Sequence, residues 1–583
     1  MTARAHKTSA TGLPAWSAIP ARVSSVLQDL PILLGGLALF YSLLAMTRYW
    51  MAPVSEHAEI SLSPSALPKY AMFSVLRIAL AYAVSLLFSV VYGYIAAYNA
   101  KAEKIMIPLL DTLQSIPVLS FLPGVMLAMV ALFPTRQLGI ELGSILLIFT
   151  GQVWNMAFSF YSSLKSIPRE MQEVARIYRW SWWQRFIQLE LPYSAIGLIW
   201  NSMMSVAGGW FFLIACEMFV LGNRDLRLPG LGSYLQTAAN AGNTRAILWG
   251  LAVMIGIIVL IDQIIWRPVI AWAEKFKFEQ VEAASAPRSP ILDLLKRSRV
   301  LPLVAAATIR PARERFTLYL ARKQQATIER PPGKFATWTA RLVLFAALAG
   351  LAYAFARMAA LLLGLTGPEL HGIFLGAGAT LLRVELTLAL AALWTIPAGV
   401  AVGLNPRLSA VAQPLAQIAA SVPATALFPI ILLLLIRIGG GLGIGSIVLL
   451  LLGTQWYILF NVIAGAMAIP TDLKEVTSIY RFRSWERWRE LLLPAIFPYL
   501  ITGFVTASGG AWNASIVAEY FHFQGKTFST VGLGAVISAA TDAGNFRVLL
   551  AATIVMAAMV VTINRLLWRR LYALAATRFK LET

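Results

Sequence analysis

The sequence carries one charged, tryptophan-containing stretch twice, and this duplication limits the folds open to the chain. The first copy runs from Glu173 to Pro192, and the second runs from Glu475 to Pro494, 302 positions later. The copies share, in the same order, Glu173 and Glu475, Val174 and Val476, Arg179 and Arg481, Trp183 and Trp485, Arg185 and Arg487, Leu191 and Leu493, and Pro192 and Pro494. Repetition at a fixed spacing indicates two copies of one structural unit. Because the flanking sequence is almost wholly apolar, we expect each docking stretch to lie in water, against the membrane face or another protein.

The repeat extends beyond the docking stretches on both sides. Before them, Pro108, Ser115, Pro117 and Pro123 match Pro414, Ser421, Pro423 and Pro429 at a spacing of 306. After them, Trp210, Glu217, Gly230, Leu231, Gly232 and Asn243 match Trp512, Glu519, Gly532, Leu533, Gly534 and Asn545 at a spacing of 302. The change from 306 to 302 predicts a four-residue deletion between the third and fourth membrane spans of the second half.

The composition places the repeated unit in a membrane. Hydrophobic residues make up 58% of the 583 residues and charged residues only 13%, against roughly 25% charged residues in soluble proteins. The chain has roughly twelve apolar runs of about 20 residues, the length that crosses a bilayer as a helix. A closed β-barrel would alternate polar and apolar residues instead. We therefore predict an all-α integral membrane protein of about 12 transmembrane helices, arranged as two parallel six-helix repeats.

The apolar runs also predict the division of the chain. The first half has spans near 30–50, 72–98, 107–133, 139–164, 195–221 and 245–272, and the second has spans near 339–363, 374–403, 411–437, 443–468, 498–521 and 546–571. The domains are accordingly a tail at 1–29, a first repeat at 30–272, a basic linker at 273–338, a second repeat at 339–575 and a tail at 576–583. The linker is either a solvated tether or, over 291–309, an interfacial helix on anionic lipid.

The basic residues predict the orientation. The net charge is +21, but Lys and Arg gather in the segments that fall on one side of a twelve-span arrangement, which by the positive-inside rule is the cytoplasm. This clustering argues against nucleic-acid binding. Both docking stretches and both termini are then cytoplasmic. The two repeats are parallel, so a pathway on the axis between them would be lined by equivalent helices.

The docking stretches resemble the cytoplasmic loop signature of permease subunits in ABC-type importers. The signature reads Glu-x-Ala, then a glycine after three residues, and ends in Leu-Pro. With the Ser-x-Pro segment before it and the Gly-Leu-Gly loop after it, the chain is most similar to the nitrate, sulfonate, taurine and bicarbonate branch, fused in tandem. The residues that match the ATPase-coupling positions are Glu173, Ala175, Arg179, Leu191, Pro192, Glu475, Thr477, Arg481, Leu493 and Pro494. Arg179 and Arg481 replace the glycine, which implies either a continuous helix or a differently shaped contact.

The resemblance implies partners and a type I importer permease fold. A separate ATPase, in two copies, would bind ATP and magnesium, and a periplasmic or extracellular binding protein would deliver the solute. The chain would lie in the bacterial inner membrane, with lipid around it. The sequence shows no phosphate loop, metal-ligand spacing or nucleophile with its base, so we expect no cofactor, no metal site and no enzyme activity in this chain.

Four polar residues inside the spans are candidates for the pathway or its gate, since a buried charge in a membrane is costly. They are Arg77 and Glu217, with their equivalents Arg383 and Glu519. The alternatives are arginines that snorkel to the surface and carboxylates at the water boundary. The expected function is ATP-driven import of a small, anionic solute. The alternative is an ion-coupled, twelve-span secondary transporter, which gives no reason for duplicated docking stretches.

Overall fold

The computed structural model describes residues 59–221, 224–273, 334–437, 441–523 and 526–578, together with most of 40–53 and a few isolated positions. In these ranges the chain is helical apart from two short hairpins, β1 (Val220–Leu221) with β2 (Arg224–Asp225) and β3 (Tyr520–Phe523) with β4 (Lys526–Ser529). Over the described part of the predicted span at 30–50, chiefly residues 43–50, the chain is helical. The N-terminal tail lies wholly outside the described residues, the linker largely so, and the C-terminal tail from residue 579 onward.

The first half contains ten α-helices in the described ranges. They are α2 (Leu67–Tyr98), α3 (Ala100–Ser115), α4 (Leu122–Leu132), α5 (Leu138–Lys165), α6 (Arg169–Ile177), α7 (Trp182–Arg185), α8 (Leu191–Glu217), α9 (Leu231–Asn240), α10 (Thr244–Ile261) and α11 (Arg267–Ala273). A short helix η2 (Val118–Phe121) joins α3 to α4. Single π-helical turns, η3 (Phe186–Glu190) and η4 (Asp262–Trp266), join α7 to α8 and α10 to α11.

The second half repeats this order. Its helices are α15 (Lys334–Leu363), α16 (Gly367–Leu404), α17 (Pro406–Ser421), α18 (Ala424–Arg437), α19 (Leu442–Met467), α20 (Thr471–Ile479), α21 (Ser484–Arg487), α22 (Leu493–Ala518), α23 (Leu533–Asp542), α24 (Phe546–Ile563) and α25 (Arg569–Arg578). Its π-helical turns, η7 (Trp488–Leu492) and η8 (Asn564–Trp568), stand 302 positions after those of the first half.

Eight helices of the described part are long and apolar enough to cross a membrane. Some of them run through several labelled elements, as Trp182–Glu217 runs through α7, η3 and α8. The eight include α2, α5, α7, α10, α16, α19, α21 and α24, and they correspond to eight of the predicted spans. The chain is therefore a multi-pass, all-α membrane protein. The predicted span at 339–363 falls within α15.

The third predicted span of each half is broken rather than straight. The axes of Ala100–Gln114 and Val118–Leu132 are bent by 87°. The break falls at Ile116, which is extended (φ −81°, ψ 127°) and precedes Pro117. Val422 before Pro423 is extended in the same way. A proline disfavours the helical conformation of the residue before it, so each helix ends there.

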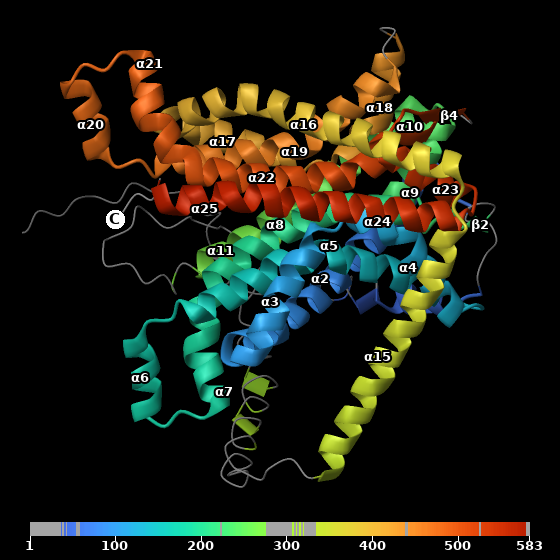
Figure 1. Cartoon of the computed structure of the whole chain (residues 1–583), viewed down its shortest axis with the longest axis horizontal. Helices are drawn as coiled ribbons and strands as arrows, with labels where there is room; N and C mark the ends of the chain where they lie inside the picture. The colour runs from blue at the N-terminus through green and yellow to red at the C-terminus, as the bar shows by residue number, and fades with distance from the viewer. Residues whose placement is uncertain are drawn as a thin grey trace, which may run out of the picture.

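The two halves interlock around one continuous apolar core. Within each half, α5 lies between α2 and α8, and α19 lies between α16 and α22. Between halves, α3 and η2 contact α24 and α22, while α18 contacts α8 and α9. Figure 1 shows α6 with α7 and α20 with α21 protruding at one end of the bundle, with the hairpins at the other. Protrusions at the same end are what parallel repeats require.

Candidate functional site

Each docking stretch forms two short helices that protrude from the bundle. Ala175 anchors α6 because it is buried among Leu164, Ile167 and Leu189. Thr477 is buried at the same point of α20. Glu173 and Glu475 lie on the exposed faces. Small side chains at the two buried positions thus seat each helix on the bundle while leaving its other face open.

Arginine takes a glycine conformation at the turn after α6. Arg179 has φ +48°, and Arg481 after α20 has φ +51°. The Trp180 N–H donates to Ala175 O at 3.0 Å and the Arg179 N–H donates to Arg176 O at 3.0 Å, the two bonds of a Schellman motif that usually carries glycine at this position. Of the two expectations for arginine here, a continuous helix is wrong. The tight turn is retained.

Leu191 and Pro192 lie apart from the exposed tip. They begin α8 directly after η3, and Leu493 and Pro494 begin α22 directly after η7. Each Leu-Pro pair directly follows a π-helical turn within a helix that continues from α7 or α21 into the span. In both halves this pair therefore marks the junction between the docking element and the membrane helix.

A polar network ties the first docking element to α2, and sequence reasoning did not single it out. The buried Glu190 carboxylate lies 2.6 Å from Arg185 Nε and accepts a hydrogen bond from the Tyr98 hydroxyl at 2.7 Å. The Arg185 guanidinium lies 4.6 Å from the centre of the Tyr98 ring. In the second half, Leu492 stands at the position equivalent to Glu190, and Leu404 stands at the position equivalent to Tyr98. The sequence signal that could have revealed this network is the difference between the halves at these two positions, where polar residues of the first half are leucines in the second.

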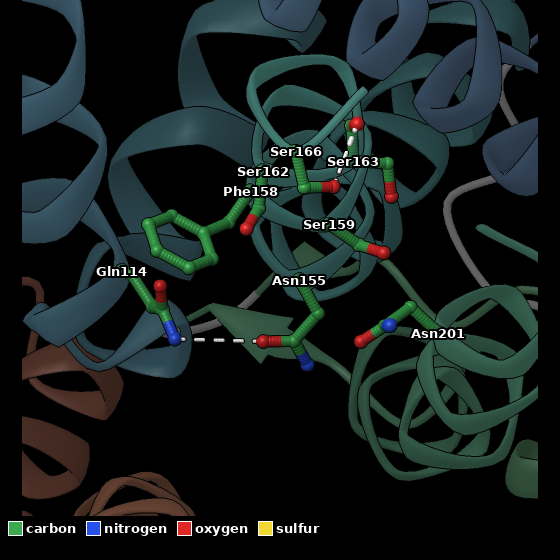
Figure 2. A pocket seen from close by; sticks show the side chains of 8 residues that line it. All are labelled: Gln114, Asn155, Phe158, Ser159, Ser162, Ser163, Ser166 and Asn201. Carbon is green, nitrogen blue, oxygen red and sulfur yellow. Dashed lines mark hydrogen bonds between the residues drawn. The ribbon is translucent and has the colours of Figure 1, made fainter. Parts of the chain in front are cut away.

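A polar cavity of about 310 Å³ lies in the first half. It faces the end of the bundle from which α6, α7, α20 and α21 protrude (Figure 1), which we call the docking end. Seven of its eight lining side chains are polar and uncharged: Gln114, Asn155, Ser159, Ser162, Ser163, Ser166 and Asn201, with Phe158 as the eighth. Figure 2 shows Asn155 between Gln114 and Asn201, with the serines along α5.

A second cavity of about 630 Å³ lies between the halves at the hairpin end. Arg227 and Gln236 line it from the first half, and Tyr520, His522 and Asp542 line it from the second. Hydrogen bonds to Asp225, the closest at 2.6 Å, raise the pKa of Arg227. Burial, followed by the hydrogen bond to Asp542, raises the pKa of Tyr520 above its usual range. Both groups therefore stay protonated, and Tyr520 acts as a donor.

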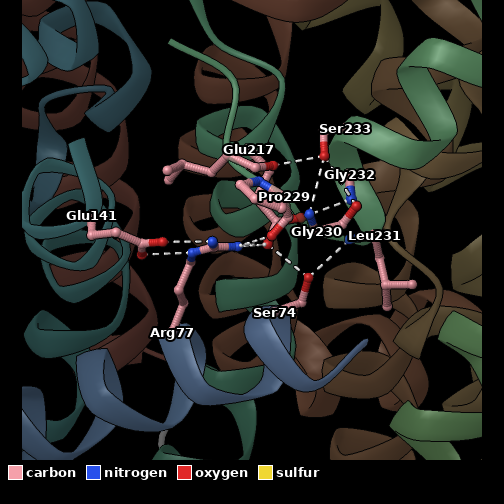
Figure 3. Close-up of polar contacts among 10 residues, drawn as sticks. Ser74, Arg77, Glu141, Glu217, Pro229, Gly230, Leu231, Gly232 and Ser233 are labelled. Carbon is pink, nitrogen blue, oxygen red and sulfur yellow. Dashed lines mark hydrogen bonds and ion pairs between the residues drawn. The ribbon is translucent and has the colours of Figure 1, made fainter. Parts of the chain in front are cut away.

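The four predicted pathway residues line neither cavity. Instead they form one buried cluster in each half. Arg77 donates to both oxygens of Glu141 at 2.6 and 2.7 Å and to Glu217 at 2.7 Å, as Figure 3 shows. Arg77 and Glu217 have no exposed surface. The alternatives of a snorkelling arginine and a carboxylate at the water boundary are therefore wrong for this half.

The second cluster repeats the first with one carboxylate fewer. Arg383 pairs with the buried Glu519, and its side chain is 10% exposed. The counterpart of Glu141 at a spacing of 302 is Gly443. In both halves a hydroxyl also donates to the glutamate, from Ser74 at 2.6 Å and from Thr380 at 2.8 Å. Sequence reasoning missed Glu141, which has no counterpart, and also the repeated Ser74 and Thr380.

The Gly-Leu-Gly loops belong to these clusters. The Gly232 N–H donates to Glu217 at 2.7 Å and the Gly534 N–H donates to Glu519 at 2.8 Å. A Cβ atom placed on Gly230 or Gly532 would lie 2.2 Å from the nearest atom of the glutamate carboxyl group. Glycine is required there because the loop backbone approaches the carboxylate so closely. Within the described ranges, no group of three or more His, Cys, Asp or Glu side chains is placed to hold a metal ion.

Comparison with known proteins gives matches in both halves. Residues 89–265 and 395–579 match the family described as "Binding-protein-dependent transport system inner membrane component". Over 148 residues the chain is 32% identical to the bicarbonate transport system permease protein CmpB of Synechococcus elongatus, covering 25% of this chain and 52% of that protein. Over 182 residues it is 29% identical to the nitrate import permease protein NrtB of Leptolyngbya laminosa, covering 31% and 62%. It is also 27% identical over 166 residues to the taurine transport system permease protein TauC of Escherichia coli, covering 28% and 56%. The matched segments thus span about half the length of these relatives or slightly more.

Proposed function

The chain belongs to the family of binding-protein-dependent transport system inner membrane components, and from this premise we propose that it is the permease subunit of an ATP-driven importer. Both halves of the pathway lie in one polypeptide. The chain sits in a bacterial inner membrane with the docking elements and both termini in the cytoplasm. Arg569 and Arg570, at the docking end with α25, support this orientation by the positive-inside rule.

The observation that carries the proposal is that the two docking tips expose the same three apolar side chains. Val174 and Val476 are 44% and 43% exposed, Ile177 and Ile479 are 76% and 74% exposed, and Tyr178 and Tyr480 are 71% and 73% exposed. Exposed apolar side chains that form a contiguous patch mark an interaction site. Two tips that expose the same apolar side chains fit two sockets of the same kind, which supports two copies of one ATPase subunit as the partner.

The remaining coupling residues have structural positions in this proposal. Glu173 and Glu475 offer an exposed carboxylate beside each apolar tip, suited to a basic group of the ATPase. Leu191 with Pro192, and Leu493 with Pro494, pass the movement of the tip to α8 and α22, which they begin. ATP binding draws the two ATPase subunits and hence the two tips together. The pathway then turns outward, and hydrolysis resets it.

The substrate proposed is a small anion, delivered by a binding protein at the hairpin end. The names of two relatives, which specify bicarbonate and nitrate, support this class, and the taurine named for a third carries an anionic sulfonate group beside its ammonium group. ATP and magnesium belong to the ATPase, and this chain has no catalytic role. Arg77, Glu217, Arg383 and Glu519 stay candidates for the gate. We propose that the Arg77–Glu217 pair holds α2 to α8 and that the Arg383–Glu519 pair holds α16 to α22. The two helices of each pair would then move together.

The test is co-purification of the full chain with its ATPase in mild detergent. We expect Ile177→Asp with Ile479→Asp to abolish ATPase binding and solute uptake, because a charge replaces the most exposed apolar side chain of each tip. Each single variant should bind one ATPase copy instead of two. Glu173→Ala with Glu475→Ala should weaken binding. The matched control for ATPase binding is Val531→Asp at the opposite, hairpin end, where Val531 is 58% exposed, and it should leave the ATPase complex intact.

An unchanged ATPase complex in the double isoleucine variant would contradict the proposal. The rival function, an ion-coupled secondary transporter, predicts that no ATPase binds to the unmodified chain and that uptake follows an ion gradient. The family match and the paired docking tips favour the importer.

A further inference from the structure

The polar cavity of the first half has the chemistry of a binding site. Asn155, Ser159 and Ser162 on α5, and Ser166 directly after its last residue, recur at intervals of three or four residues, which places them on one face of the helix. Gln114 from the end of α3 and Asn201 from α8 complete the lining. Ser166 follows the last residue of α5 and shortly precedes α6, so the cavity reaches the docking end of the span.

Most hydroxyl donors of this cavity are unused. Among the described residues, no hydrogen bond is made by the side-chain hydroxyls of Ser159, Ser162 or Ser163. Ser166 Oγ donates to Ser163 O at 2.9 Å, and Asn201 Nδ2 donates to Gly197 O at 2.9 Å. Unsatisfied polar groups are costly in hydrocarbon. Three free hydroxyls and three amides on one side of a span therefore indicate a water-filled pathway rather than a lipid-facing surface.

The lining of this cavity is not repeated in the second half. At a spacing of 302, Asn155, Ser162, Ser163 and Asn201 are replaced by Tyr457, Ala464, Gly465 and Gly503. The two counterparts that keep a polar group are Asn461 in place of Ser159 and the hydroxyl of Tyr457 in place of Asn155, while Ser166 becomes Ala468. The two halves share their docking tips but differ in this lining. Most of the hydroxyl and amide donors at these positions therefore belong to the first half alone.

We propose that this cavity is a transit site for a small oxyanion, built from hydroxyl and amide donors of the first half alone. This inference rests on the proposed function. Neither a carboxylate nor a basic side chain lines the cavity. The nearby Lys165 pairs with Glu103 at 2.8 Å. Donors without a fixed positive charge replace part of the anion's hydration shell, yet they hold it weakly enough for release, as conduction requires.

The test uses single cysteine substitutions, because the chain has one cysteine, Cys216, which is buried. In the full chain carrying Cys216→Ala, we compare Ser162→Cys with its equivalent Ala464→Cys, whose native side chain is also exposed. Each is labelled with a sulfonate-bearing methanethiosulfonate in the presence of nitrate, hydrogencarbonate or, at equal ionic strength, chloride. Nitrate or hydrogencarbonate bound in the cavity should slow the labelling of the cysteine at position 162. The rate should fall by a factor of one plus the ratio of anion concentration to Kd, where Kd is the dissociation constant of the anion from the cavity, so labelling slows about tenfold at an anion concentration of about nine times Kd. Labelling at position 464 should not change.

Equal protection at both positions, or none at position 162, would overturn the transit site. A second readout is uptake by the complete importer, where Ser159→Ala with Ser163→Ala should raise the KM for the anion and leave ATPase binding unchanged. The labelling needs no ATPase, so it remains readable even if no ATPase binds the chain. Failure of the transit site and failure of the importer proposal are therefore distinguishable.

Discussion

At the scale of single residues, the chain contains its own reference for the strained turns. Gly242 after α9 and Gly544 after α23 have φ +64°, and their Schellman hydrogen bonds match those of Arg179 and Arg481. The same motif thus occurs twice with glycine and twice with arginine. A left-handed conformation costs a residue with a Cβ roughly 1–2 kcal/mol. Retaining arginine at both docking turns despite this cost is consistent with a role for the guanidinium at the exposed tip.

We predict that Arg179→Gly makes the docking turn more stable. The relief of strain exceeds the extra entropy that glycine loses, so the net gain is about 0.5–1 kcal/mol. Exchange of the Trp180 amide hydrogen, which is bonded to Ala175 O, should slow by up to about fivefold. Arg176→Gly, inside α6, should have the opposite effect, because glycine destabilises a helix interior. Faster exchange in Arg179→Gly would refute the strain argument, whereas slower exchange with weaker ATPase binding would identify the guanidinium as a contact.

At the scale of elements, the two docking units share a tip but differ in attachment. Glu190 links η3 to the end of α2 through Tyr98 and Arg185. The second unit has Leu492 at the equivalent position, buried in an apolar setting. A buried carboxylate with two partners fixes geometry more strictly than apolar contact does. The first unit should therefore follow α2 more closely than the second follows α16.

Replacing Glu190 by leucine tests this attachment. Glu190→Leu copies the second half, so we expect the fold and ATPase binding to persist while the amides of 182–185 exchange faster. Solute transported per ATP hydrolysed should fall, because movement of the tip reaches α2 less directly. The matched control is Glu490→Gln, since Glu490 is exposed and its pairing with Arg489 at 3.5 Å lies at the surface, where such pairs are worth little. Unchanged exchange and coupling in Glu190→Leu would show that apolar packing alone attaches the first unit.

The elements also show what could be predicted from the sequence. Long apolar runs predicted about twelve spans, and eight of these correspond to long apolar helices of the described part, because every residue of such a run contributes to the signal. The breaks at Ile116 and Val422 were not predicted, although the prolines after them were part of the repeat. Apolar periodicity continues across a bend, and only the local rule for residues before proline marks it. Glu141 was missed for another reason, since its partner Arg77 is 64 positions away and no second copy drew attention to it.

At the scale of the whole molecule, the halves are held together by exchanged contacts. η2 of the first half packs against α22, and Thr553 in α24 donates a hydrogen bond to Ser120 O at 3.1 Å. At the other side of the axis, α18 of the second half packs against α8 and α9. Membrane helices that are already inserted associate through such packing and hydrogen bonds. The linker is therefore not needed to keep the halves together once both are in the membrane.

We predict that the chain cut in the linker at residue 285 still assembles when its two parts are co-expressed. The parts should co-purify in mild detergent, because the contacts of η2, α3, α18, α22 and α24 remain. Thr553→Trp should separate the cut parts while the uncut chain tolerates the change, since covalent linkage raises the effective concentration of one half near the other. Ile554→Trp is the control, as this neighbouring side chain is 37% exposed and should leave assembly intact. Parts that purify separately without any substitution would mean that the linker, rather than the exchanged helices, holds the halves together.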